Sequence, residues 1–226
     1  MSRTLQIVIA IAALLALAAG GSLYWSQHKK AQLRGDIAAL VGQASARLRA
    51  AFSMEADQNA ADSAEGVSRL EQYTAEFDKQ VDALHAMDTG RDSPLAEATE
   101  DFLTTARQIT MYQGKMHRLR IDVGADAQAL TEHIRTANMR ERGWIGAALQ
   151  KKELLEKKYF DYRLASDAYS DLARTYLANR RKLAPLVGEA ALVEEAVAID
   201  ARDRAREAAK QTAAVVEQAK QLPQAR

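Results

Sequence analysis

The ninety residues between Pro94 and Pro185 contain no proline, and apolar side chains recur among them in alternating steps of three and four residues. This spacing places the apolar side chains on one face of an α-helix, which has 3.6 residues per turn. A single helix of that length would extend about 135 Å. We therefore expect at least one helical hairpin, with its break near residues 122–124 or near residues 143–146.

The remaining sequence also favours helix. The chain has three prolines, and outside its N-terminal apolar run it shows no alternating strand pattern. The predicted fold is all-α: an N-terminal transmembrane helix followed by an elongated, coiled-coil-like bundle of about four or five helices. Because the apolar seam repeats every seven residues, we expect left-handed packing at about 20°. The predicted segments are a short flank (1–4), a membrane anchor (5–25), one bundle domain (26–222) and a frayed tail (223–226).

Local signals mark several boundaries in the bundle. One helix is expected to run from the anchor to about Phe52, followed by a polar connection over 54–66 and a second helix over 67–88. Gly90 is predicted to follow that helix in a left-handed conformation. Ser93 is predicted to cap the next helix, with Pro94 in its first turn. Pro185 is expected to end the long segment, and the last helix to span 186–221.

The predicted anchor is a run of twenty-one uncharged residues. At about 1.5 Å per residue it would span roughly 30 Å, the thickness of the bilayer hydrocarbon core. Aromatic residues and lysines follow it, as at a membrane interface. A cleaved signal peptide ending near Ala18 and a buried core helix are the alternatives. The anchor residues that we single out are Leu5, Ile9, Leu14, Leu17, Tyr24 and Trp25.

The orientation of the bundle is less strongly indicated. Lys29, Lys30 and Arg34 follow the run, which by the positive-inside rule favours a cytoplasmic bundle. The signal-like start behind Arg3 favours export. We expect a single-pass protein of the inner membrane with its helical domain on the periplasmic side.

Charge is unevenly distributed although the net charge is only +1. Residues 54–101 contain thirteen acidic and three basic side chains, whereas residues 104–182 contain sixteen basic and nine acidic ones. Acidic and basic helices packed side by side explain this pattern, and a two-signed surface that meets a partner is the alternative. No nucleic acid is expected as a partner.

We find no sequence signature of an enzyme or of a cofactor site. The chain has no cysteine, no phosphate-binding glycine loop and no zinc-protease motif. His85, three residues after Asp82, supplies only one copy of the carboxylate–histidine spacing that a di-metal bundle repeats. We expect the four histidines to be exposed or interfacial. No cofactor, metal, small-molecule substrate or catalytic residue is predicted.

Aromatic and basic residues of the long segment form the candidate interaction surface. Tyrosines spaced by seven residues share one helix face, with arginines after them. Half-buried core packing is the alternative interpretation of these tyrosines. Two glycines bracket a tryptophan, which is expected either to form a binding tip or to cap the core. The candidate residues are Trp144, Tyr159, Tyr162, Tyr169, Tyr176, Arg180 and Arg181.

The sequence therefore predicts a membrane-anchored, non-enzymatic protein of a bacterial cell envelope that acts as an interaction or scaffold module. Its helical seam would contact a protein partner or a second copy of the chain. One alternative is a periplasmic sensory bundle that binds a ligand. Another is a coiled coil tethered to the membrane on its cytoplasmic side.

Overall fold

The computed structural model describes the backbone of residues 3–136 and 143–221. It describes side chains from Trp25 onward within these ranges, except for Ser26, Gln58, Asn59, Arg91 and Gln221. The predicted all-α class is confirmed, since the described part of the chain contains helices and no strand. The helices are α1 (Arg3–Met54), α2 (Gln58–Ala61), α3 (Ala64–His85), α4 (Ser93–Thr136), α5 (Trp144–Val187) and α6 (Glu195–Gln221), with 3₁₀ turns η1 (Thr89–Arg91) and η2 (Glu189–Ala191).

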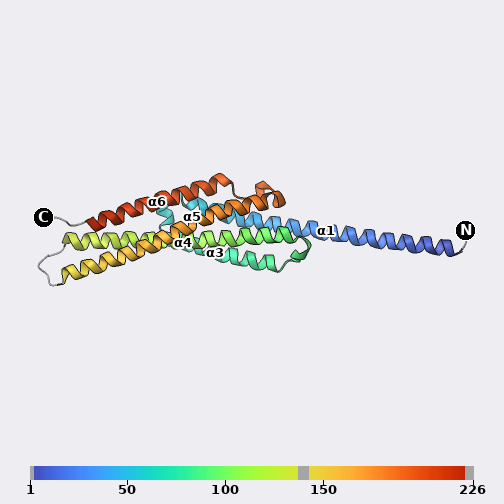
Figure 1. The fold of residues 1–226 in the computed structure, drawn as a ribbon, viewed down its shortest axis with the longest axis horizontal. Coiled ribbons are helices and arrows are strands. Elements are labelled where there is room, and N and C mark those ends of the chain that lie inside the picture. The colour runs from blue at the N-terminus through green and yellow to red at the C-terminus, as the bar shows by residue number, and fades with distance from the viewer. Residues whose placement is uncertain (1–2, 137–142, 222–226) are drawn as a thin grey trace.

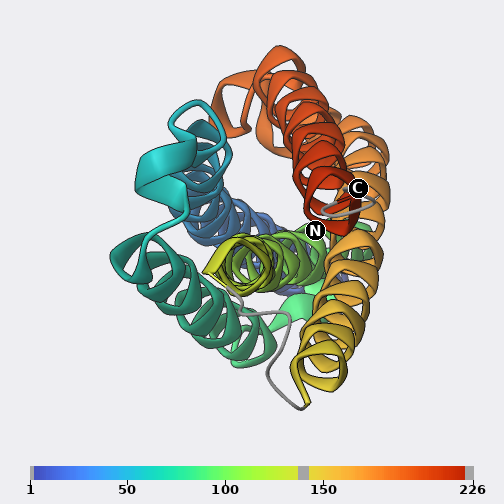
Figure 2. The same ribbon diagram turned by 90° about the vertical axis from the view of Figure 1, so that its left-hand side faces the viewer.

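The long helices run up and down along one axis (Figure 1). The N-terminal part of α1 projects from the bundle, and the α4–α5 hairpin forms the opposite end. Seen along this axis, α4 lies at the centre, with α1, α3, α5 and α6 around it (Figure 2). A central helix meets neighbours on several sides, so α4 buries polar side chains as well as apolar ones.

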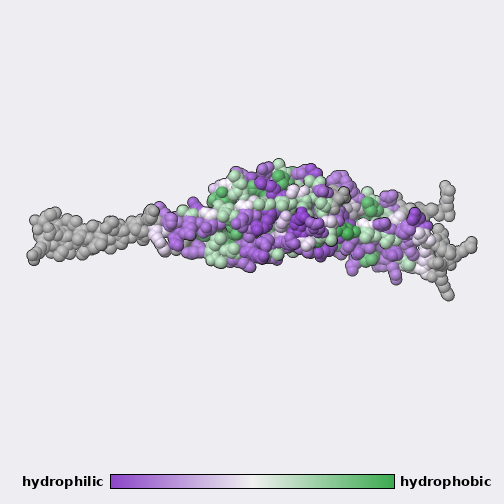
Figure 3. Space-filling model, turned by 180° about the vertical axis from the view of Figure 1, so that it is seen from behind, coloured by the Kyte–Doolittle hydropathy of each residue, from purple (hydrophilic) through white to green (hydrophobic). Residues whose placement is uncertain are grey.

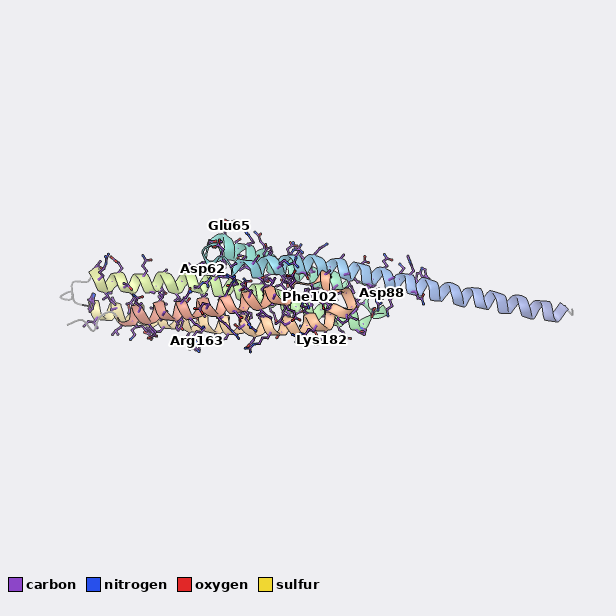
Figure 4. The ribbon with its side chains drawn as sticks, turned by 90° about the horizontal axis from the view of Figure 1, so that it is seen from above. Asp62, Glu65, Asp88, Phe102, Arg163 and Lys182 are labelled. Atoms are coloured by element: carbon purple, nitrogen blue, oxygen red, sulfur yellow. The ribbon has the colours of Figure 1, made fainter. Side chains whose placement is uncertain are left out.

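The core follows the predicted apolar stripes. Ile37 and Leu48 of α1 are fully buried, as are Phe77 of α3 and Phe102 of α4. Phe102 packs beside Tyr176 of α5, with ring centroids 5.9 Å apart, and it lies in the middle of the bundle (Figure 4). The α6 stripe consists largely of buried alanines: Ala198, Ala201, Ala205, Ala208 and Ala219.

Of the two predicted hairpin positions, the later one is used. Helix α4 continues through Gly124 to Thr136, and α5 begins after Gly143. Gly143 has φ +98°, a left-handed conformation that glycine adopts without steric cost. The polar connection after α1 is also confirmed, with the four-residue helix α2 inside it.

Three boundary predictions are wrong. Helix α3 ends at His85, and Gly90 lies in η1 without a positive φ. The Asp92 carbonyl, not Ser93, begins α4 by accepting bonds from the backbone N–H groups of Leu95 and Ala96. Helix α5 passes through Pro185 to Val187 and ends at Gly188, whose φ is +91°.

The predicted membrane anchor lies almost entirely outside the described side chains. The backbone of α1 is helical from Arg3, but nothing is described of the side chains of Leu5, Ile9, Leu14, Leu17 and Tyr24. Trp25, the last anchor residue, is exposed, and Lys29 Nζ lies 5.6 Å from its ring centroid. Within the part of the chain whose side chains the structure describes, no helix is both long and apolar enough to span a membrane.

Candidate functional site

A buried polar cluster joins the end of α1, the turn before α3 and the middle of α4. It consists of Glu55, Asp62, Gln113, His117 and Arg120. His117 is fully buried, and its two ring nitrogens face two different carboxylates. Nε2 lies 2.9 Å from Glu55 Oε1, and Nδ1 lies 3.0 Å from Asp62 Oδ1. The His117 ring therefore bridges the residue after α1 and the turn before α3.

The other two α4 residues complete the cluster. The Gln113 amide donates to Glu55 Oε1 and to the Ala51 carbonyl, both at 2.8 Å. Arg120 Nε donates to Asp62 Oδ1 at 2.8 Å, and Arg120 Nη2 lies 2.9 Å from His117 Nδ1. With His117 protonated, the cluster pairs two carboxylates with two cations, which is the condition under which buried charge is tolerated.

The environment shifts the protonation of two cluster members. Burial alone would lower the pKa of His117, but its hydrogen bonds to Asp62 and Glu55 and the Glu55 charge raise this pKa above the ordinary value. Burial alone would raise the pKa of Asp62, but hydrogen bonds from His117 and Arg120 lower it. Both shifts favour the charged forms, as expected for an ion-paired network.

Local turn chemistry positions the two carboxylates. Glu55 is the first residue after α1, and Asp62 lies between α2 and α3, next to the turn that carries Glu65 (Figure 4). The Ser63 hydroxyl caps α3 by accepting from Gly66 N–H at 2.9 Å. Gly66 lies so close to α2 that an added Cβ would stand 2.4 Å from the Ala60 carbonyl oxygen. The residue at position 66 must therefore lack a side chain.

Several buried polar atoms around the cluster have no hydrogen-bond partner among the described residues. They include Glu55 Oε2, Gln113 Oε1 and Arg120 Nη1, together with the hydroxyls of Tyr162 and Tyr169 on α5. Arg120 and Thr212 lie near the Tyr162 hydroxyl, but not in hydrogen-bonding geometry. Burial raises the pKa values of both tyrosines, so their hydroxyls stay protonated at neutral pH.

The predicted tyrosine surface is not a surface in this structure. Tyr162, Tyr169 and Tyr176 are all 0% exposed and face the core, which confirms the packing alternative. Tyr176 donates to the Val193 carbonyl at 3.2 Å and lies against Phe52, with ring centroids 5.7 Å apart. Residues seven apart share a helix face, and the sequence pattern alone does not say whether that face is inside or outside.

The other predicted surface residues have separate roles. Tyr159 is partly buried beside Tyr162. Trp144 is partly buried at the hairpin end, where its ring stacks on His133 with centroids 6.0 Å apart, so it packs against α4. Arg180 is buried and Arg181 is exposed.

Arg180 holds the turn between α5 and α6. Its Nε donates to the Val193 carbonyl at 2.8 Å, and its guanidinium also pairs with Glu189 and Glu195. Arg181 pairs with Glu195 at the surface, at 3.2 Å. The role of this basic pair is therefore to fix the α5–α6 connection.

Four exposed apolar side chains of α5 lie on the side of the helix away from its buried tyrosines. Ile145, Leu149, Phe160 and Leu164 are 67%, 59%, 57% and 53% exposed. Phe160 and Leu164 lie two residues to either side of Tyr162, so they point away from the core. We call these four residues the outer stripe of α5. Elsewhere the surface is mainly hydrophilic with scattered hydrophobic patches, as the face in Figure 3 shows.

A groove of about 530 Å³ runs between α3 and α4. Thr74 and Thr110 contact each other in it through their hydroxyls at 2.9 Å, and Glu71 and Arg118 form an ion pair beside it. A second hollow of about 310 Å³ shares Glu71 and Arg118 and reaches Asp62. The groove therefore adjoins the buried polar cluster.

Among the described residues, no group of three or more histidine and carboxylate side chains is arranged to hold a metal ion. No protein-family model, no curated protein and no solved structure matches this chain.

Proposed function

We propose that this protein is a non-enzymatic interaction module, held at a membrane by residues 5–25, whose bundle pairs with a second copy of itself through the outer stripe of α5. The observation that carries this proposal is the exposure of four large apolar side chains on one face of one helix. An apolar stripe on the solvent side of a bundle helix is typical of helix–helix association.

The charges along the outer stripe suit a second copy of the chain. Lys152, Glu153, Glu156 and Lys157 lie between its two apolar ends and are all exposed. Consecutive residues point about 100° apart, so Glu153 and Glu156 lie on the stripe itself, and Lys152 and Lys157 flank its two sides. In a parallel symmetric pair, the two stripes face each other, so the flanking lysines of each copy lie beside the glutamates of the other. Lys152 would then lie beside Glu153 of the second copy, and Glu156 would lie beside its Lys157.

A parallel pair also agrees with the proposed tether. Helix α1 continues the bundle axis toward the N-terminus (Figure 1). Two copies paired in parallel would present both N-termini on the same side and reach one membrane together. The stripe spans twenty residues, about 30 Å along the helix, which is enough for a coiled-coil contact.

Disulfide cross-linking tests the pairing, because the chain has no cysteine. Phe160→Cys in the full chain should give a cross-linked dimer on mild oxidation, since position 160 faces its own copy in a parallel pair. The matched control is Val215→Cys on α6, where the native side chain is 46% exposed. Equal cross-linking at both positions, or none at position 160, would contradict the proposed interface.

Membrane attachment has its own test. Leu14→Arg combined with Leu17→Arg should move the full chain out of the membrane fraction, because charged residues at the centre of a span are strongly disfavoured. Reporters fused to the C-terminus separate the two orientations, and we propose the periplasmic one. Retention of the double variant in the membrane fraction would contradict residues 5–25 as the anchor.

A sensory function is the second candidate, and the groove between α3 and α4 is the observation that favours it. Its volume lies within the range of small-molecule sites, and it has threonine hydroxyls beside an apolar wall. A ligand at 100 times its dissociation constant would stabilise the full chain by about 2.7 kcal/mol. A thermal-shift screen of amino acids and small organic acids tests this candidate. Hits that Gly114→Leu abolishes would support the groove as their site.

A further inference from the structure

The connection between α1 and α3 (residues 55–63) is held on α4 by the buried polar cluster. Ala56, Asp57 and Ala60 are exposed, and Ala61 alone of the connection's apolar residues is fully buried. Glu55 at one end and Asp62 near the other both contact His117. The imidazole therefore ties both ends of the connection to α4, and Arg120 of α4 holds Asp62 beside it, at 2.8 Å.

The protonation state of the His117 ring decides how many carboxylates it can donate a hydrogen bond to. A charged ring has two N–H groups and donates to Glu55 and Asp62 at once. A neutral ring has one N–H group, so one of the two carboxylates loses the imidazole as a donor. The Glu55 side chain is fully buried, and the Asp62 side chain is 26% exposed. Asp62 can turn to water and Glu55 cannot, so the bridge to Asp62 is the one that opens.

We propose that His117 is a proton-dependent latch: its charged form fastens both ends of the α1–α3 connection to α4, and loss of the proton leaves the Asp62 end held by Arg120 alone. In the neutral state Nε2–H still donates to Glu55, and Nδ1 accepts from Arg120 Nη2, which lies 2.9 Å away. The end of α1 therefore stays in place while the turn around α2 loosens.

The surrounding groups leave His117 as the member that changes charge near neutral pH. Glu55 and Asp62 of the connection and Arg120 of α4 face the ring. From α5, Tyr162 and Tyr169 approach the cluster, and burial raises their pKa values further. Thr212 of α6 lies near Tyr162 and does not titrate.

The sign of the effect follows from linkage. The folded pKa of His117 lies above its ordinary value, so the bridge is fully formed below the unfolded pKa of about 6.5 and is lost as the pH rises through the folded pKa. The protection of the connection should fall about tenfold for each unit by which the pKa of His117 with the connection closed exceeds its pKa with the connection open.

Hydrogen exchange of the full chain tests the latch. Protection factors, corrected for intrinsic exchange rates, are measured for residues 56–62 between pH 6 and pH 9. In the wild type they should fall as the pH rises, whereas in His117→Gln, which keeps the ion pair between Arg120 and Asp62, they should be independent of pH. The matched control is His85→Gln, because His85 also pairs with a carboxylate, Glu100, but at the surface. This control should behave like the wild type.

A second variant keeps the test decisive if His117→Gln does not fold. Asp62→Asn keeps an oxygen acceptor but removes one negative charge, so it should lower the pKa of the His117 ring and move the opening of the connection to lower pH. The NMR signal of the ring measures this pKa. The latch is overturned if wild-type protection of residues 56–62 is constant over this range. It is also overturned if the ring does not titrate above its unfolded value.

Discussion

Tyr169 and Tyr176 lie seven residues apart on the buried face of α5, but their hydroxyl groups have different environments. Tyr176 donates to the Val193 carbonyl, whereas the Tyr169 hydroxyl has no partner among the described residues. Tyr176→Phe should lower the free energy of unfolding by about 1 kcal/mol. Tyr169→Phe should leave it unchanged or raise it by up to about 1 kcal/mol, because an unsatisfied buried hydroxyl is removed. Urea unfolding of both variants measures the difference, and equal losses would contradict it.

Gly66 supplies a second prediction at the scale of single residues. Gly66→Ala should destabilise the chain by about 1–3 kcal/mol, because the new Cβ would meet the Ala60 and Ala61 carbonyl oxygens at 2.4 and 2.7 Å. The matched control is Gly42→Ala on α1, where nothing lies within 4 Å. There alanine should stabilise the helix by up to about 1 kcal/mol. If thermal unfolding shows both variants to be stabilised, the close approach of α2 is wrong.

The sequence did contain a signal for the buried polar cluster. Gln113, His117 and Arg120 follow steps of four and three residues, on the same helix face as Ile109 and Val123. Polar residues at these core positions should have indicated an internal network. Their partners Glu55 and Asp62 lie more than fifty residues away in a polar segment, and no local pattern pairs them. Our expectation of exposed or interfacial histidines was wrong for His117.

At the scale of elements, the α5–α6 connection depends on Arg180. Arg180→Met keeps the aliphatic stem but leaves the Val193 carbonyl and the carboxylate of Glu189 without this donor. We expect a loss of about 2–3 kcal/mol. Arg181→Met, one residue on, removes only a surface ion pair and should cost much less. Chemical denaturation compares the two variants. Similar losses would mean that Arg180 does not fasten the connection.

Helix boundaries were predictable where glycine must adopt a positive φ, and less so elsewhere. Gly143 does so at the hairpin, whereas Gly124 has ordinary helical neighbours and does not interrupt α4. Pro185 lacks the N–H that would bond to the Arg181 carbonyl four residues earlier, yet α5 continues through it for two more residues. The ends of such helices depend on tertiary contacts, which the type of a single residue does not predict.

At the scale of the whole molecule, α6 should be the least stable long helix. Its buried face is mostly alanine, and alanine removes little apolar area from water compared with the leucine and phenylalanine side chains of α4. Native-state hydrogen exchange should therefore show α6 opening at a lower free energy than α4. Equal protection of the two helices, or slower exchange in α6, would contradict this ranking.

The architecture as a whole was only partly predictable. Periodicity and the scarcity of proline were sufficient for the all-α class and for the order of the helices. The central position of α4 was not, because amphipathic stripes of similar width give no indication of which helix meets the most neighbours. That position explains why α4 carries Gln113, His117 and Arg120 inside the bundle.

The buried polar cluster also has an evolutionary consequence. A mutation at one of its four charged positions, Glu55, Asp62, His117 and Arg120, would leave an uncompensated charge in the interior, which typically costs 3–5 kcal/mol. Replacement of all four by apolar residues of similar volume could be neutral or stabilising. Descendants of this chain should therefore keep the four residues together or exchange them together, and these positions should covary.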